Sequence, residues 1–191
     1  MSLTDTYGFV SKKSLVKVNN SILPIEDIWD QYKSEVTTNT IICEEGMEET
    51  VPATELSVTT YDEEIKKFKQ VKITKLFRHK MYNCTSEIHL ENGLSITFTE
   101  KTKFLTPDGW KTKCYVNSLI GMPKNFDDYV TKQLNGSYTC ITDGDMYFIK
   151  VNMVGIEILN DYVYGIEVNN PINNSIIVDG IICNTFDVSS K

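Results

Sequence analysis

The sequence predicts an all-β domain with one or two short helices, and three observations carry this prediction. Short runs rich in β-branched and aromatic residues alternate with Gly, Pro and Asn turn signals through most of the chain. A clear helical period of apolar residues occurs at only one place. The 191 residues, 41% hydrophobic and 10% aromatic, suffice for one domain with a buried core and exclude a disordered chain.

The first expected elements are a β-hairpin and a helix. A strand at residues 15–18 runs into Asn-Asn-Ser turn chemistry at 19–21 and returns at 22–25. A short amphipathic helix follows over residues 25–32. Its apolar face comprises Ile25, Ile28, Trp29 and Tyr32. The acidic stretch at 44–49 is interpreted as a solvated loop.

The middle of the chain reads as a series of short strands. Strands are expected at residues 56–61, 68–77, 81–90 and 93–98. Pro107 and Gly109 mark a further turn, and a polar loop at 125–135 carries a helical turn. A strand at 146–151 is expected to pair with its neighbour at 154–159.

The end of the chain carries the most chemistry. Runs of strand character at 163–168 and 174–184 flank an Asn/Pro-rich turn, and the second run ends at Asn184, directly before Thr185. The carboxamide of an Asn can attack its own backbone carbonyl, which closes a succinimide and cuts the bond to the next residue. The Thr185 hydroxyl beyond that bond is a nucleophile. An isolated Asn-Thr pair is more often a polar strand end, so the wider context decides.

Several classes of protein are disfavoured by composition. A net charge of −7 without a basic stripe argues against nucleic-acid binding. Neither a signal peptide nor an apolar run of about 18 residues occurs, so we expect no membrane contact and a reducing, cytoplasmic location in a viral or microbial host. Five scattered cysteines and two histidines supply neither a disulfide framework nor a zinc site. No Gly-x-Ser-x-Gly elbow of a serine hydrolase exists, and no cofactor is expected.

Four segments in order resemble inteins. The end of the chain is similar to the C-terminal intein signature, which closes on Asn before a Cys, Ser or Thr. Residues 71–80 and 93–104 are similar to internal segments of inteins, particularly those in B-family DNA polymerases. Residues 2–6 resemble the N-terminal Ser/Cys-x-x-Gly-Asp-Thr pattern without its glycine. The span from 111 to 161 leaves no room for a homing endonuclease, so the chain resembles a mini-intein.

This resemblance implies a compact, horseshoe-like Hint (hedgehog/intein) fold that brings both chain ends together and splices itself. Ser2 would attack the Met1 carbonyl and form an ester, Thr185 would take over the acyl group, and Asn184 would cyclise to release the intein. Residue 1 and residues 185–191 would then be the flanks of an intein at 2–184. The partners would be the chain's own flanks, and the domain would be a single-turnover, autocatalytic monomer.

The sequence departs from the family at four assisting groups. The histidine expected three residues after Thr99 is Thr102, and Thr99 itself is retained. The other three replacements are Gly165 for an aspartate, Asn173 for a loop histidine, and Cys183 for the penultimate histidine.

Other residues are candidates to replace the missing groups. Lys101, Lys103 or His79 could supply charge or act as acid or base, although each is individually more typical of a surface residue. Cys183 is either a weak donor to the Asn184 carbonyl or a small apolar strand residue. The N-terminal register also leaves Ser11 as an alternative to Ser2.

Two rival readings stay open. One keeps the fold and loses splicing, as a degenerate or cleavage-only domain. The other is a β-rich interaction module in which the Asn-Thr ending is accidental. The products of a flanked chain, measured by mass, discriminate between them.

Overall fold

The computed structural model describes residues 8–33, 40–42, 46–131, 138–169 and 174–185. The helices are α1 (Ile25–Tyr32) and the 3-10 helix η3 (Phe126–Tyr129). The strands are β1 (Val10–Ser11), β2 (Leu15–Val18), β3 (Ser21–Pro24), β4 (Thr40–Ile42), β5 (Met47–Thr50), β6 (Ser57–Asp62), β7 (Lys67–Leu90), β8 (Ser95–Phe98), β9 (Lys103–Thr106), β10 (Gly109–Lys111), β11 (Leu119–Pro123), β12 (Cys140–Asp143), β13 (Met146–Val168), β14 (Ser175–Val178) and β15 (Ile181–Asn184). The all-β prediction is confirmed.

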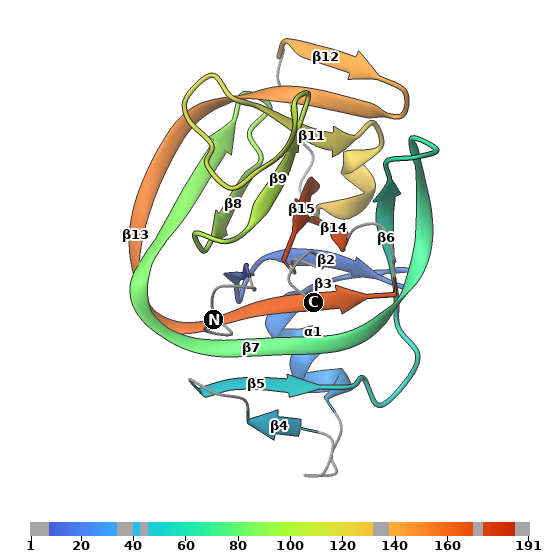
Figure 1. The fold of residues 1–191 in the computed structure, drawn as a ribbon, viewed down its shortest axis with the longest axis vertical. Helices are drawn as coiled ribbons and strands as arrows, with labels where there is room; N and C mark the ends of the chain where they lie inside the picture. The colour runs from blue at the N-terminus through green and yellow to red at the C-terminus, as the bar shows by residue number, and fades with distance from the viewer. Residues whose placement is uncertain (1–7, 34–39, 43–45, 132–137, 170–173, 186–191) are drawn as a thin grey trace.

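Two long strands, β7 and β13, form a curved antiparallel ribbon that wraps around the shorter strands (Figure 1). The pairing runs from Ile73 with Val168 to Leu90 with Val151. Strands this long bend because the right-handed twist accumulates along them. The ribbon encloses β8, β9, β14 and β15.

The sequence predicted breaks in both long strands, and these breaks do not occur. Arg78 and Lys80 stay in the β7 ladder because they pair directly with Tyr164 and Tyr162 of β13. The predicted pairing of 146–151 with 154–159 is also wrong. Asn152 makes an irregularity in the pairing rather than a turn, and the chain continues in one direction.

The acidic stretch around residue 48 forms a strand, so the prediction of a solvated loop is wrong there. Strand β5 pairs with β7, and Glu48 makes an ion pair of 2.7 Å with Arg78. Glu49 lies 3.1 Å from the Lys75 ammonium. The basic residues of β7 thus neutralise the acidic residues, which explains why this stretch tolerates partial burial.

The last predicted run is a hairpin of two strands. Val178 of β14 pairs with Ile181 of β15, and Asp179 and Gly180 form the two-residue turn between them. Both turn residues have positive φ, 52° and 78°. This geometry is typical of an Asp-Gly hairpin turn, a local signal that the sequence does contain.

The remaining local predictions agree with the structure. The hairpin β2–β3, helix α1, strands β6 and β8, and the turn between β9 and β10 lie where the sequence placed them. Helix α1 buries Ile25, Ile28 and Trp29 against the core. The predicted helical turn in the 125–135 loop is confirmed as η3, within the part that is described.

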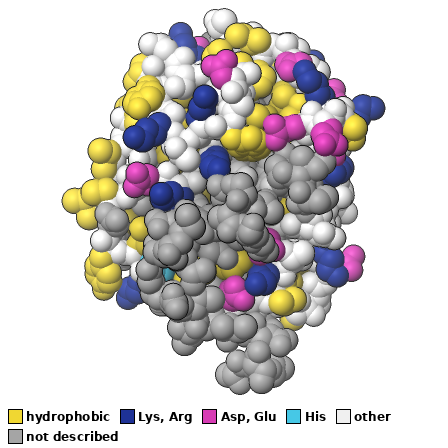
Figure 2. All heavy atoms as spheres, viewed as in Figure 1, with side chains coloured by type: hydrophobic (Ala, Val, Ile, Leu, Met, Phe, Trp, Pro, Cys, Tyr) yellow, Lys and Arg dark blue, Asp and Glu magenta, His cyan; other side chains and the backbone are white. Residues whose placement is uncertain are grey.

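The surface is mixed in character. On the face shown in Figure 2, Lys and Arg side chains are interspersed with Asp and Glu, and hydrophobic side chains gather at the left edge. The exposed hydrophobic side chains of the β7–β13 ribbon include Tyr82, Ile156 and Ile158. Among the described residues, no helix is both long and apolar enough to cross a membrane.

Candidate active site

The first described residues lie beside the last ones. The Gly8 amide donates a hydrogen bond of 3.2 Å to the Thr185 carbonyl. Val10 then pairs with Phe98 of β8 on one side and with Tyr164 of β13 on the other. Strand β1 therefore lies between β8 and β13, and Gly8, just before it, lies next to the Asn184–Thr185 bond.

Two threonine hydroxyls hold the backbone of Phe9. The Phe9 amide donates to Thr99 Oγ1 at 2.9 Å, while its carbonyl accepts from Thr102 Oγ1 at 3.0 Å and from the Thr99 amide at 2.9 Å. A turn after β8, closed by the Thr102 amide on the Thr99 carbonyl, aims both hydroxyls at the same residue. Both threonines are buried, so these bonds are made without competition from water.

The Asn184–Thr185 bond is fixed by strand β15. Asn184 pairs with Ser175 of β14 on one side and with Lys103 of β9 on the other. The Thr185 hydroxyl donates to the Ile166 carbonyl at 3.1 Å and accepts from the Ile166 amide at 3.2 Å. Asn184 and Thr185 are buried, so this bond and its neighbouring hydroxyl are held away from bulk water.

Two glycines permit the close approach of the segments. A Cβ on Gly8 would lie 2.5 Å from Thr102 Cα, a separation that real Cβ atoms do not show. A Cβ on Gly165 would lie 3.4 Å from the Gly8 carbonyl oxygen. The Gly8 carbonyl therefore lies against Gly165, directly beside Ile166, which holds the Thr185 hydroxyl.

The structure brings one of the two histidines near this segment. The His79 ring lies 6.2 Å from the Phe9 ring, centroid to centroid. Its Nδ1 is buried and makes no hydrogen bond within the part of the chain that is described. By contrast, Lys101 has an exposed side chain in the turn before β9.

The Cys183 side chain is fully buried in the core. Burial raises the pKa of its thiol well above the ordinary value, so the group stays neutral. Ser11 belongs to β1 and its hydroxyl lies 3.4 Å from the Ser14 hydroxyl. Ser2 lies outside the described residues, and its role stays a prediction.

The sequence reasoning missed Asp179 in the turn between β14 and β15. Its carboxylate accepts a hydrogen bond of 2.8 Å from the Leu15 amide, which ties the hairpin to β2. Burial raises the pKa of Asp179 to about 6, against the smaller lowering effect of the Leu15 and Ser14 hydrogen bonds. The Asp-Gly pair was the signal that could have found it.

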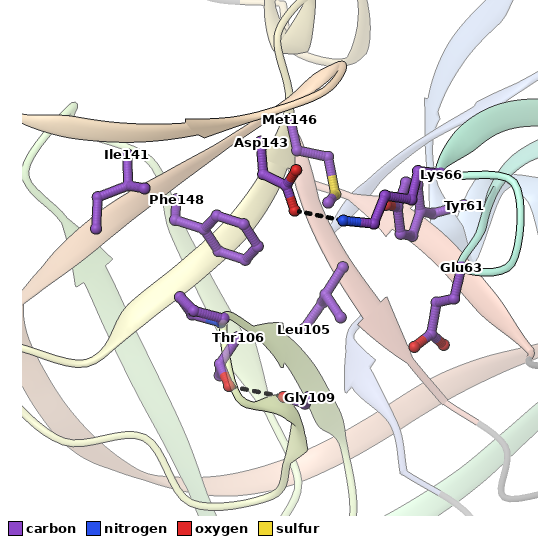
Figure 3. A pocket seen from close by; sticks show the side chains of 11 residues that line it. Tyr61, Glu63, Lys66, Leu105, Thr106, Gly109, Ile141, Asp143, Met146 and Phe148 are labelled. Carbon is purple, nitrogen blue, oxygen red and sulfur yellow. Dashed lines mark hydrogen bonds and ion pairs between the residues drawn. The ribbon is translucent and has the colours of Figure 1, made fainter.

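A surface pocket of about 330 Å³ lies elsewhere, between β6, β9 and β13 (Figure 3). It is lined by hydrophobic side chains such as Leu105 and Phe148, and an ion pair of 3.3 Å between Lys66 and Asp143 crosses its side. The predicted site residues that the structure describes are not among its lining residues. The site built above is therefore a junction of chain ends rather than a ligand pocket.

Comparison with known proteins gives the fold. No family profile and no curated protein sequence matches the chain. Solved structures do match. A DnaB intein from Synechocystis sp. PCC 6803 superimposes with a TM-score of 0.65 at 16% identity, over 93% of this chain and 98% of that one.

Two further inteins agree. The transcription factor IIB Mvu mini-intein gives a TM-score of 0.71 at 17% identity, over 94% of this chain and 99% of that one. The TvoVMA intein gives 0.69 at 16% identity, covering 92% and 96%. The chain therefore has the Hint fold of inteins over nearly its whole length, which confirms the predicted fold. The relation to polymerase inteins stays a prediction.

Proposed function

We propose that this domain splices itself out of a longer chain in a single-turnover, autocatalytic reaction. The observation that carries the proposal is the meeting of two backbone segments. One ends in the buried Asn184–Thr185 bond, and the other is Gly8–Phe9, which Thr99 and Thr102 hold. An interaction module has no need for such a junction, whereas splicing needs both cut sites in one place.

The downstream cut falls to Asn184. The carboxamide nitrogen of Asn184 attacks the main-chain carbonyl carbon of the same residue, and the bond from that carbon to the Thr185 nitrogen breaks. The proton that the carboxamide nitrogen loses ends on the Thr185 nitrogen. Strand pairing on both sides of Asn184 holds the backbone still while the side chain closes the ring. Burial excludes water, which would otherwise hydrolyse an ester at this site.

Thr185 is the acceptor of the upstream acyl group. Its hydroxyl proton is held by the Ile166 carbonyl, and its oxygen faces the Ile166 amide. Once the ester has formed and Asn184 has cyclised, the freed Thr185 amine attacks the ester and the flanks are joined by an amide. The partners of the domain are thus its own flanking sequences, and it acts as a monomer in a reducing cytoplasm, without cofactor, membrane or nucleic acid.

The test uses a precursor with folded domains fused before Met1 and after Lys191. Intact mass spectrometry should show joined flanks and an excised segment. Asn184→Ala should abolish release of the downstream flank. Asn160→Ala, at an exposed asparagine of β13, is the matched control and should process like the parent.

Other outcomes select the rival readings. Release of the downstream flank without ligation would support a cleavage-only domain. A precursor that stays intact, as the Asn184→Ala variant does, would contradict splicing and favour an interaction module.

A further inference from the structure

We propose that the upstream junction is the Gly8–Phe9 peptide bond and that Thr185 attacks it directly. This inference rests on the proposed function and replaces its first step. The resemblance to inteins placed the first step at Ser2, or alternatively at Ser11.

The grip on the leaving amide is the first argument. Thr99 Oγ1 accepts the N–H of this peptide bond at 2.9 Å, and Thr102 Oγ1 fixes the next carbonyl at 3.0 Å. Two buried hydroxyls from one turn thus converge on a single residue. If β1 served only as a strand, backbone hydrogen bonds to its neighbouring strands would satisfy it, and these two hydrogen bonds from side-chain hydroxyls would not be needed.

The electrophile, the Gly8 carbonyl, and the nucleophile, the Thr185 hydroxyl, contact two neighbouring residues of β13. The Gly8 carbonyl oxygen lies against Gly165, and the Thr185 hydroxyl is bound by Ile166. The two groups therefore lie against consecutive residues of one strand. The hydrogen bond from the Gly8 amide to the Thr185 carbonyl holds the two segments side by side.

Glycine at position 8 and phenylalanine at position 9 define the chemistry. Thr102 leaves no room for a side chain on residue 8, so the acyl group under attack is the least hindered one available. Phe9 has no nucleophilic side chain, and its ring packs with Met47, Phe77 and Val163. Residue 9 therefore cannot form an ester itself.

The step balances with the groups present. Thr185 Oγ1 bonds to the Gly8 carbonyl carbon, and the bond from that carbon to the Phe9 nitrogen breaks. The hydroxyl proton of Thr185 ends on the Phe9 nitrogen, which leaves as an amine. The Thr99 hydroxyl oxygen accepts a hydrogen bond from that nitrogen at 2.9 Å, so it lies directly against the leaving group. Thr99 is thus a catalytic residue, and Thr102 is a positioning residue.

The experiment sequences the ligated product of the flanked precursor by tandem mass spectrometry. The expected junction joins Gly8 to Thr185. Ser2→Ala and Ser11→Ala should ligate at the parental rate. A junction that joins Met1 to Thr185 would overturn this inference and leave splicing standing, whereas a precursor that never ligates would overturn the proposed function as well.

A glycine pair gives a second test. Gly8→Ala should lower the ligation rate at least about tenfold while Asn184 still cleaves, because the added Cβ displaces the segment from Thr102. Gly155→Ala is the matched control, since a Cβ there meets nothing closer than 3.9 Å. Retained cleavage by Asn184 shows that the variant is folded. Equal ligation by Gly8→Ala and the parent would refute the assigned junction.

Discussion

Replacing Thr99 by valine tests whether its hydroxyl serves the reaction or only the fold. Valine keeps the volume and the branching of threonine, so the core should not open. The change leaves the buried Phe9 N–H without its acceptor at 2.9 Å. Such a loss costs about 1 to 3 kcal/mol. If the full cost is felt at the transition state, ligation should slow by about 5- to 150-fold, because about 1.4 kcal/mol is a factor of ten.

The assay has two readouts. Ligation of the flanked precursor is followed by mass, and unfolding in urea is measured in an Asn184→Ala, Thr185→Ala background so that neither bond is cut. Thr85→Val is the matched control, because Thr85 is buried and its hydroxyl donates to the Glu157 carbonyl, away from the chain ends. Both variants should lose stability, and only Thr99→Val should lose ligation rate. Equal ligation rates for the two variants would refute the assigned role.

Three further predictions concern the hairpin and the turn near the site. Burial raises the pKa of Asp179 from 3.8 to about 6 in the folded state, so the folded protein favours the protonated carboxyl. The stability that this protonated carboxyl contributes is fully present below pH 4 and is lost as the pH rises through 6. In Asp179→Asn, the free energy of unfolding should match the parent near pH 4 and exceed it by about 3 kcal/mol above pH 6, by urea titration. Gly180→Ala should cost about 1 to 2 kcal/mol in the same assay, since φ is 78° and a Cβ would lie 3.2 Å from Leu94. Lys101→Ala should ligate at about the parental rate, because the side chain is exposed.

Features encoded locally were predictable from the sequence. Helix α1 and the β2–β3 hairpin follow from apolar spacing and Asn-Asn turn chemistry. Thr99 and Asn184 were singled out by motif, and both lie at the meeting of the chain ends. Their partner Thr102 was noticed as a missing histidine, and the structure shows its hydroxyl bound to the Phe9 carbonyl.

Features that depend on distant partners were not predictable. Strand β7 passes through Arg78 and Lys80 because β13 and Glu48 supply pairing, and none of these partners is near in sequence. The position of Gly8 is a further example. Gly8 packs against Thr102 and donates a hydrogen bond to Thr185, and both residues are distant from it in the sequence. A single sequence carries no signal for such contacts until the pairing of strands is known.

The intact mass of the excised segment tests the central claim most directly. If Asn184 cyclises and the upstream cut falls after Gly8, the segment should begin at Phe9 and end in a succinimide, one water lighter than the free acid. Because a succinimide takes up water to give the same free acid, a segment that has the free-acid mass from the earliest time points, with no lighter species before it, would contradict cyclisation. A segment that begins at Ser2 would contradict the direct attack by Thr185 on Gly8.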